Sequence, residues 1–411
     1  MGEEVKEGDH VVLMKSFDSG NMKILPVVKG STVHYGKLHF DPGPLVGTHY
    51  GAVFEIRDGT MFEVEDFKSF DRELSEIMSS RISTFNEKTQ FSQEKIIRKK
   101  KMKRNANVVT VLRPSLLLVN EMLFARDKIG GIRADLLAQL MTLSNIQAGS
   151  KCLVLDHNLG MLTSAVMSRI LPDGVCIQLL QDYEILQTTR KTMKMLNINE
   201  EDCRENLCSI TIRDLYKVYK NIDKFESEGE ILASRNRAHL VRLSAVQESD
   251  GDSEAAKRFK SDEEDTQQRV DQLQTNLLRK EGNRELRQRE RILAANYLKA
   301  RSQDALIMAV QNDHPLPILK MVYQFLAPSG QFVIYSDTVT PLLDCYQYLK
   351  TNSLAVCVNI TESWLRRYQV LPDRTRPEMN ASGYGGYLLS GTKAIFGCQA
   401  EAASKIANNT A

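Results

Sequence analysis

The spacing of hydrophobic and polar positions changes several times along the chain, and these changes outline its domains. Residues 8 to about 66 hold short apolar segments separated by Gly, Pro and Asp, at 11–14, 22–28, 32–40 and 52–57. Asp58-Gly59 stands between two such segments, which is a strong signal for a two-residue β-hairpin. Several short strands within some sixty residues predict a small β-barrel, to which we assign residues 1–70.

A helical spacing follows, in which Leu74, Ile77, Met78 and Ile82 share one face. A strand-like alternation at 108–112 and an amphipathic helical pattern at 133–143 come next. We interpret residues 71–150 as a helical, basic bridge between two domains.

A doubly wound α/β domain is predicted from Cys152 onwards. A short apolar strand at 152–155, a loop that ends at Gly160, a helical pattern and a Pro172-Asp173-Gly174 turn lead into a second strand at 175–180. We expect further helices at 183–196, 316–326 and 341–349, and further strands at 208–213, 304–310, 331–335 and 355–360. We place this domain at 151–398 and interpret residues 399–411 as a flexible tail.

Residues 220–303 interrupt the α/β pattern. Glu248–Asp265 contains eight acidic residues and few apolar ones, a composition typical of disorder, and the charged segment 270–299 is compatible with helix. Because a compact α/β fold does not need so long a connection, we interpret residues 220–303 as a largely disordered or helical insertion.

The first strand-to-helix loop of the α/β domain has the outline of a nucleotide-cofactor site but lacks its contents. Such loops need two or three glycines for close approach of the backbone to a ligand, and only Gly160 is present. An acid should follow the second strand to bind ribose hydroxyls, yet the first one, Asp182, comes late. We therefore expect a degenerate site, in which Asp156 makes a structural hydrogen bond.

Catalytic motifs are equally sparse. Asp313 and His314 are the candidate acid and base after the fourth strand of the domain, and we interpret Asp313 more simply as a helix cap or loop acid. The sequence contains no Gly-x-Ser-x-Gly, phosphate-loop or His-Glu-x-x-His pattern. Seven cysteines without a Cys-x-x-Cys pair indicate buried thiols in a reducing compartment, so we expect neither disulfides nor a metal site.

The formal net charge of the chain is only +2, so any affinity for polyanions must come from local clusters of basic residues. Seven of the ten residues 95–104 are basic, a density that favours polyanion binding through counterion release. The alternatives are a solvated helix face or a nuclear import signal. The longest apolar runs fall short of a membrane span, and the acidic N-terminus is unlike a signal peptide, so we expect an intracellular, soluble protein without a membrane partner.

Five segments give the chain a family resemblance. They are His34-Tyr35-Gly36-Lys37, Leu45–Gly51, Lys88–Lys95 with its lysine run, Leu137–Asn145, and Met379–Gly391 with the sequence Met-Asn-Ala-Ser-Gly-Tyr-Gly-Gly-Tyr-Leu-Leu-Ser-Gly. With these segments the chain resembles the non-catalytic subunits of the eukaryotic tRNA adenine-N1-methyltransferases that modify the T-loop adenine.

The resemblance implies an N-terminal β-barrel, a Rossmann-like domain of the class I methyltransferase type with a degenerate donor site, and a nuclear location. It also implies tRNA binding and assembly with a catalytic paralogue into a two-plus-two heterotetramer, in which the paralogue binds S-adenosylmethionine and this chain binds no cofactor. By the same carry-over, the expected tRNA contacts are Lys95, Arg98, Lys99, Lys100, Lys101, Lys103, Arg104, Arg133, Asn380, Ser382, Gly383, Tyr384, Gly385, Gly386 and Tyr387. The glycines among them would permit close approach to a phosphate or to the partner chain.

Two other functions stay open at this stage. An active RNA methyltransferase with an atypical donor loop would bind the donor by itself, which the missing glycines and ribose acid argue against. A plain assembly scaffold would use its basic run only for nuclear import.

Overall fold

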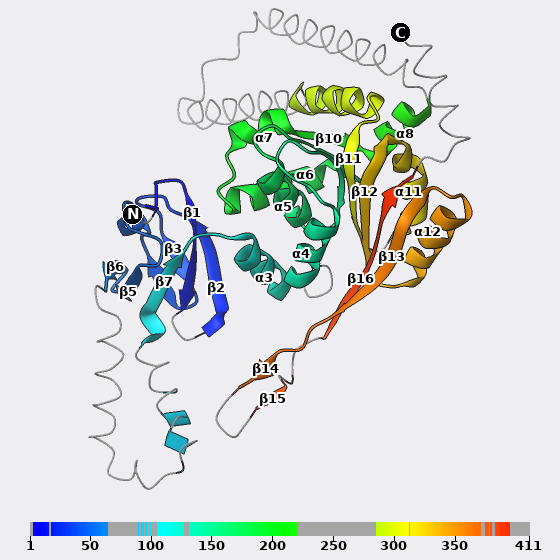
Figure 1. Ribbon diagram of the computed structural model, residues 1–411. Helices are drawn as coiled ribbons and strands as arrows, with labels where there is room; N and C mark the ends of the chain where they lie inside the picture. Colours follow the sequence, from blue (N-terminus) through cyan, green and yellow to red (C-terminus); the bar gives the residue numbers. More distant parts are fainter. Residues whose placement is uncertain are drawn as a thin grey trace, which may run out of the picture. The chain divides into compact units, whose positions relative to one another are not determined.

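The computed structural model describes residues 3–15, 18–64, 89, 92, 93, 95, 96, 99, 105–126, 131–220, 285–311, 313–370, 375–377, 379 and 383–394. The chain divides into two compact units, one formed by Met1–Ala134 with Thr189–Glu200 and the other by Asp135–Thr188 with Glu201–Ala411. Each unit has its own apolar core. Figure 1 shows the elements in sequence colours.

The first unit is built on a five-stranded antiparallel sheet with the order β2-β1-β7-β5-β6. The elements of this unit are β1 (His10–Lys15), β2 (Asp18–Pro26), β3 (Val33–Tyr35), β4 (Leu38–Phe40), η1 (Gly43–Leu45), β5 (Val53–Arg57), β6 (Thr60–Glu63), η2 (Asn105–Asn107), β7 (Val108–Leu112) and α3 (Leu116–Arg126). Asp58 and Gly59 both have positive φ, 49° and 81°, which confirms the predicted two-residue hairpin. Alternate residues of the strands, such as Val11, Leu13 and Phe54, form the core.

The structure departs from the sequence interpretation at three points in this unit. Strand β7 pairs with β1 and β5 in the middle of the sheet, so residues assigned to the bridge belong to the N-terminal domain. The expected strand 32–40 is a hairpin, since Gly36 turns the chain at φ 64° between β3 and β4. Strands β2 and β6 end the described sheet order, so the small β-barrel is present here as an open sheet plus a hairpin.

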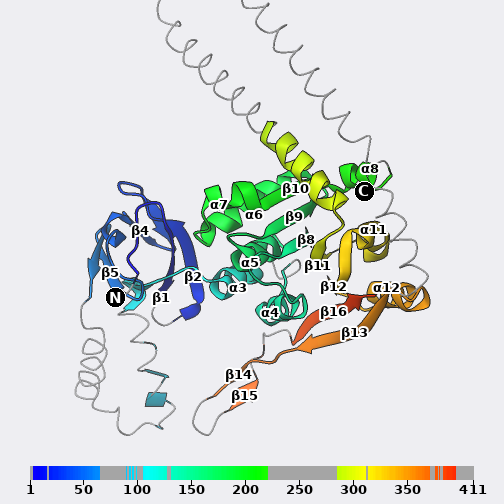
Figure 2. The ribbon, with the colours of Figure 1, turned by 45° about the horizontal axis from the view of Figure 1, so that its top comes forward.

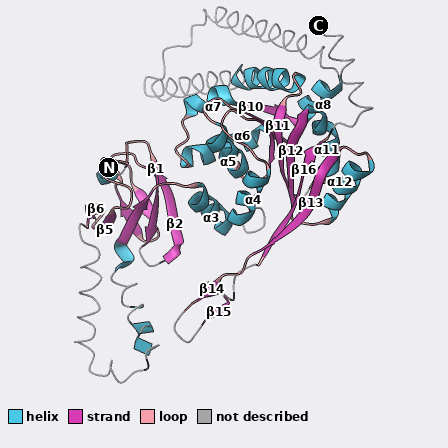
Figure 3. Ribbon diagram, in the orientation of Figure 1, coloured by secondary structure: helices cyan, strands magenta, loops and turns pink. Residues whose placement is uncertain are grey.

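The second unit contains a seven-stranded sheet with the order β10-β9-β8-β11-β12-β16-β13, and helices lie on both sides of it (Figures 2 and 3). The bounds are α4 (Ala134–Leu143), β8 (Lys151–Asp156), α5 (Met161–Ile170), β9 (Val175–Leu180), α6 (Tyr183–Met195), α7 (Glu200–Asn206), β10 (Leu207–Thr211), α8 (Ile212–Lys220), β11 (Gln303–Val310), α11 (Pro315–Val322), η4 (Tyr323–Phe325), β12 (Leu326–Ser336), α12 (Thr340–Thr351), β13 (Ala355–Trp364), β14 (Tyr368–Gln369), β15 (Arg376–Pro377) and β16 (Tyr384–Lys393).

Five parallel strands and one reversed strand define the topology. Strands β10, β9, β8, β11 and β12 run parallel, whereas β16 runs antiparallel to both β12 and β13. The order reverses direction at β8, from which the chain first moves outward to β10 and then returns to β11. This is the doubly wound, Rossmann-like fold that the sequence predicts, and its crevice lies beside the carboxyl end of β8.

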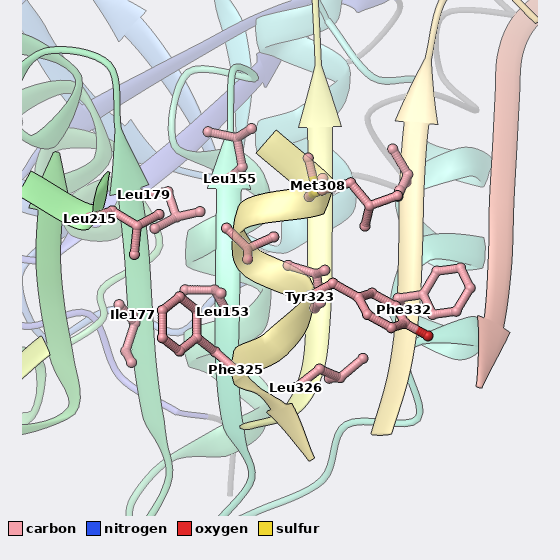
Figure 4. Close-up of a cluster of buried hydrophobic side chains, with 14 of the residues drawn as sticks. Leu153, Leu155, Ile177, Leu179, Leu215, Met308, Tyr323, Phe325, Leu326 and Phe332 are labelled. Carbon is pink, nitrogen blue, oxygen red and sulfur yellow. The ribbon is translucent and has the colours of Figure 1, made fainter. Parts of the chain in front are cut away.

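The core on one face of this sheet joins strands to four helices. Figure 4 shows Leu153 of β8 and Ile177 of β9 close to Phe325, and Leu179 of β9 close to Leu215. Buried residues of α8, α11, α12 and a helix at 285–299 complete the same cluster.

That last helix corrects the predicted insertion. Ala294, Ala295 and Leu298 are buried in the core, so the described end of the 220–303 segment is part of the α/β domain. Their i, i+1, i+4 spacing puts these small and apolar side chains on one helix face among charged residues. The predicted strand 208–213 also ends earlier, since α8 begins at Ile212.

Candidate functional site

The carboxyl ends of the parallel strands meet at one edge of the sheet, where open α/β folds bind their ligands. At this edge β8 ends at Asp156, β9 at Leu180 and β11 at Val310. The loops that follow these three strands therefore form the candidate site.

The Asp156 carboxylate forms hydrogen bonds with the loop and helix that follow it. Its carboxylate is only 1% exposed and accepts hydrogen bonds from the backbone N–H groups of Asn158 and Thr163, both at 2.7 Å. Burial raises the pKa of this carboxyl, although the two hydrogen bonds act in the opposite direction. The Thr163 N–H belongs to the first turn of α5. Because Asp156 accepts its hydrogen bond, this N–H is not free to bind a ligand at the helix N-terminus. The expected structural hydrogen bond is confirmed.

The loop has left-handed backbone at two successive residues, only one of which is a glycine. Leu159 and Gly160 both have left-handed φ values, 52° and 77°. For a residue with a side chain this conformation costs roughly 1–2 kcal/mol, which glycine avoids. Met161 and Leu162 are fully buried at the start of α5, so their side chains pack into the domain instead of leaving the helix start open.

Side chains from the neighbouring strand ends bond to one another across the site. The Gln181 amide, just after β9, donates to the carboxylate of Asp313, which follows β11. His157 Nδ1 lies 3.3 Å from both the backbone N and O of Gln311. The position directly after β9 thus holds an amide engaged with the protein. Two N–H groups of the loop and the side chains of Gln181 and Asp313, which could otherwise contact a nucleoside donor, thus have partners within the fold.

The candidate acid and base also have structural partners. His314 is the N-cap of α11, where its Nδ1 accepts a hydrogen bond from the Leu316 N–H at 3.3 Å. Its Nε2 lies 3.1 Å from a carboxylate oxygen of Asp344 on α12. The cap is therefore His314, and Asp313 is a loop acid, which corrects one of the two roles we considered for it.

The predicted tRNA contacts fall into three groups. In the basic run, Lys95 and Lys99 are exposed and each has helical backbone. The remaining members of the run lie outside the described residues: Arg98, Lys100, Lys101, Lys103 and Arg104.

Arg133 is the second group, and the structure buries it. Its side chain is only 9% exposed, directly before α4, and it has an interaction partner within the protein. In this conformation Arg133 is not available to a phosphate. No local pattern predicts this burial, because arginine side chains are mostly exposed in folded proteins.

The glycine segment is the third group, and here the structure gives another reason for the glycines. Residues 383–387 lead into and begin β16, an interior strand, while Asn380 and Ser382 lie outside the described residues. Gly386 is buried with φ 97°, and a Cβ on it would lie 2.6 Å from Tyr335 Cε2. A Cβ on Gly383 would lie 2.7 Å from Trp364 Nε1. Packing inside the domain therefore requires the glycine at 386, whereas Gly383 lies against the exposed Trp364 ring.

Among the described residues, no group of three or more His, Cys, Asp or Glu side chains is placed to hold a metal ion. Within the same part of the chain, no helix is both long and apolar enough to cross a membrane.

Comparisons with known proteins show which family the chain belongs to. The Gcd10p family model matches residues 60–268. The non-catalytic subunit TRM6 of the Mus musculus tRNA (adenine(58)-N(1))-methyltransferase is 29% identical over 94% of this chain and 88% of its own length. The corresponding subunit of Dictyostelium discoideum is 25% identical over 95% of this chain and 79% of its own length.

A solved structure supports the fold. The SAM-dependent O-methyltransferase of Thermotoga maritima aligns with a TM-score of 0.53 over 96% of both chains, at 12% sequence identity. Its likeness confirms the methyltransferase-type fold of the α/β domain. On the match to half of its length, the chain belongs to the Gcd10p family.

Proposed function

We propose that this chain is the non-catalytic, tRNA-binding subunit of a tRNA adenine-N1-methyltransferase complex, required for tRNA binding and for the activity of a catalytic paralogue. The observation that carries the proposal is the bonding of Asp156 to the first turn of α5, since it engages two backbone N–H groups of the loop in which a methyltransferase-type fold would hold its donor. The names of the relatives from Mus musculus and Dictyostelium discoideum agree with this reading.

In this proposal the chain binds no cofactor, and S-adenosylmethionine belongs to the catalytic paralogue. The Gln181–Asp313 and His157–Gln311 contacts support this division, because they occupy the strand ends where a donor would sit. An active methyltransferase with an atypical loop is the weaker alternative for the same reason.

The RNA-binding role rests on the basic run at 95–104, of which Lys95 and Lys99 are exposed. Lysine and arginine contacts to phosphates position an RNA without reading its sequence, so recognition would be mainly of tRNA shape and of unstacked bases. The same run would serve nuclear import, and we place the protein in the nucleus.

Assembly with the paralogue, as a two-plus-two heterotetramer, needs an exposed apolar surface. The segment around β14 and β15, beyond the ends of β13 and β16 in Figure 1, offers one. Its most exposed large hydrophobic side chains are Trp364, Tyr368, Val370 and Met379, with exposed fractions of 65%, 54%, 75% and 86%. Exposed hydrophobic groups at this density are typical of interaction surfaces.

The partner contact has a built-in probe, because Trp364 is the only tryptophan of the chain. Burial of Trp364 on assembly would shift its fluorescence to shorter wavelength, measured with a tryptophan-free version of the paralogue. An unchanged spectrum in a complex that has assembled would place the interface elsewhere.

The RNA role is tested by reversing the charge of Lys99, Lys100, Lys101 and Lys103 to Glu in the assembled complex. We expect a large loss of tRNA affinity and a shallower dependence of log affinity on log salt concentration, by about 0.7–0.9 per lost phosphate contact. A matched control reverses four dispersed, exposed lysines, Lys6, Lys29, Lys37 and Lys191, and changes net charge equally. If the variant with the charge-reversed basic run binds tRNA as tightly as the wild type, the RNA role is refuted and the assembly-scaffold alternative is favoured.

A further inference from the structure

Helix α8 presents an exposed face of aromatic and basic side chains that the proposed function has not used. The helix immediately follows β10, the edge strand of the parallel part of the sheet (Figure 1). Its exposed residues are Arg213, Tyr216, Lys217, Tyr219 and Lys220, which we call the α8 face. Four of them recur at i, i+3, i+4 and i+7, and therefore form one stripe along the helix.

The opposite side of α8 fixes the helix to the domain. Leu215 and Val218 are fully buried in the main core. Thr211 Oγ1 accepts a hydrogen bond from the Asp214 N–H at 3.1 Å, which caps the helix start. The Asp214 carboxylate in turn lies 3.4 Å from Arg291 Nη1, on the helix at 285–299. The α8 face is thus held on a rigid element.

The two tyrosines of the face form a stacked pair. Their ring centroids are 6.5 Å apart with an angle of 20° between the ring planes. They are 49% and 44% exposed, so the pair remains open to solvent. Lys220 Nζ lies 4.7 Å from the centroid of the Tyr216 ring, which combines a cation with the aromatic surface.

The charges of the face have one sign. Lys217 pairs with Asp214 at 3.4 Å, whereas no carboxylate in the described part of the chain forms an ion pair with Arg213 or Lys220. The position of two lysines in the last turn suits the helix dipole, but the dipole gives no reason for two exposed, stacked tyrosines beside them.

Stacked aromatics next to cations are the groups with which proteins bind single-stranded nucleic acid. Each base has a π face that stacks on tyrosine, and the adjacent phosphate pairs with lysine or arginine. Tyrosine and arginine also occur at protein interfaces, but the exposed charges of α8 are all positive, which favours a polyanion. The face also starts at the carboxyl edge of the sheet, where this fold binds its ligands.

We propose that the α8 face is a second RNA-binding surface, on which an unpaired base stacks against Tyr216 and Tyr219 while Arg213 and Lys220 hold the flanking phosphates. The proposal rests on the proposed function, because it assigns a further contact to an RNA-binding subunit. It adds an unpaired nucleotide to the phosphate contacts of the basic run.

The test uses the full chain co-purified with its catalytic paralogue and a fluorescently labelled tRNA, followed by anisotropy. The Tyr216→Ala/Tyr219→Ala variant should bind roughly 5- to 150-fold more weakly for one lost stacked base, with an unchanged salt slope. The Arg213→Ser/Lys220→Ser variant should lower the salt slope by about 1.4–1.8, as expected for two phosphate contacts. Circular dichroism melting and co-purification check that each variant folds and assembles.

Helix α12 offers a matched control. Lys350 lies 5.8 Å from the Tyr346 ring centroid, the same i, i+4 arrangement as Tyr216 and Lys220, but without a second stacked tyrosine. Lys350→Ser should leave tRNA affinity and salt slope unchanged.

Three results would overturn the proposal. If both α8 variants bind tRNA like the wild type while the charge-reversed basic run does not, the α8 proposal fails and the proposed function stands. If the α8 variants fold but no longer co-purify with the paralogue, the α8 face is a protein interface. If the complex binds tRNA no better than the paralogue alone, the proposed function and the α8 proposal fail together.

Discussion

Replacing Gly386 by Ala separates the packing role of the glycine segment from an RNA-binding one. The φ of Gly386 is 97°, in the region that side chains disfavour, which costs Ala roughly 1–2 kcal/mol. The new Cβ would also lie 2.6 Å from Tyr335 Cε2 and 3.1 Å from the Ser336 carbonyl oxygen. Forcing an extra methyl group into a packed site adds about 1–3 kcal/mol. The expected loss is thus about 2–5 kcal/mol of the free energy of unfolding.

A control isolates the backbone contribution. Gly149 has a similar φ of 82°, but nothing lies within 4 Å of its virtual Cβ. Gly149→Ala should therefore lose only about 1–2 kcal/mol. Urea unfolding of both full-length variants, followed by circular dichroism, gives the two values, and tRNA affinity per folded complex should be unchanged. Wild-type stability of Gly386→Ala, combined with weakened tRNA binding, would refute the packing explanation.

Three further predictions concern the strand-end loops and a buried lysine. Leu159→Gly should raise the free energy of unfolding by about 0.5–1 kcal/mol, because glycine relieves the left-handed φ of 52°; a lower stability in urea would contradict this. Burial raises the pKa of Asp156 above its usual 3.8, so the folded state binds more protons than the unfolded state and loses stability as pH rises through the raised pKa. The stability of the wild type relative to Asp156→Asn should accordingly fall as pH rises from below 3.8, in denaturant titrations at several pH values, and a rise would count against it. Burial lowers the pKa of Lys393 to about 8. The free energy of unfolding should therefore increase between pH 8 and the ordinary pKa of 10.5, because the unfolded state binds more protons than the folded state in that range. Lys393→Met should remove this increase, and an increase that persists in the variant would belong to another group.

Local signals predicted most of the elements. The Asp58-Gly59 turn is determined by its own two residues, which is why it could be read from sequence. The strands around Leu153 and Ile177 are largely apolar, as expected for parallel strands covered on both faces. The few glycines in the loop before α5 predict an altered site, and this stays a prediction.

The features that sequence could not supply are non-local. The Gln181–Asp313 hydrogen bond joins residues 132 positions apart, and no spacing rule connects them. The membership of β7 in the N-terminal sheet depends on pairing with β1 and β5 across a long intervening segment. Gly386 resembles an exposed loop glycine in sequence, and only the neighbouring Tyr335 gives it another role.

The α8 face was missed for a different reason. The pattern predicts a strand over 208–213, which hides the helical stripe of Arg213, Tyr216 and Lys220. Boundaries between elements are the weakest part of any pattern-based prediction, and a shift of two residues concealed this surface.

The central claim is that the methyltransferase-type crevice of this chain no longer holds a methyl donor. Isothermal titration of S-adenosylmethionine into the lone chain, and into the chain co-purified with its catalytic paralogue, tests it most directly. No binding heat is expected for the lone chain, and one donor per heterodimer is expected for the complex. One-to-one donor binding by the lone chain would show that the loop between β8 and α5 is a working site, and would contradict the account.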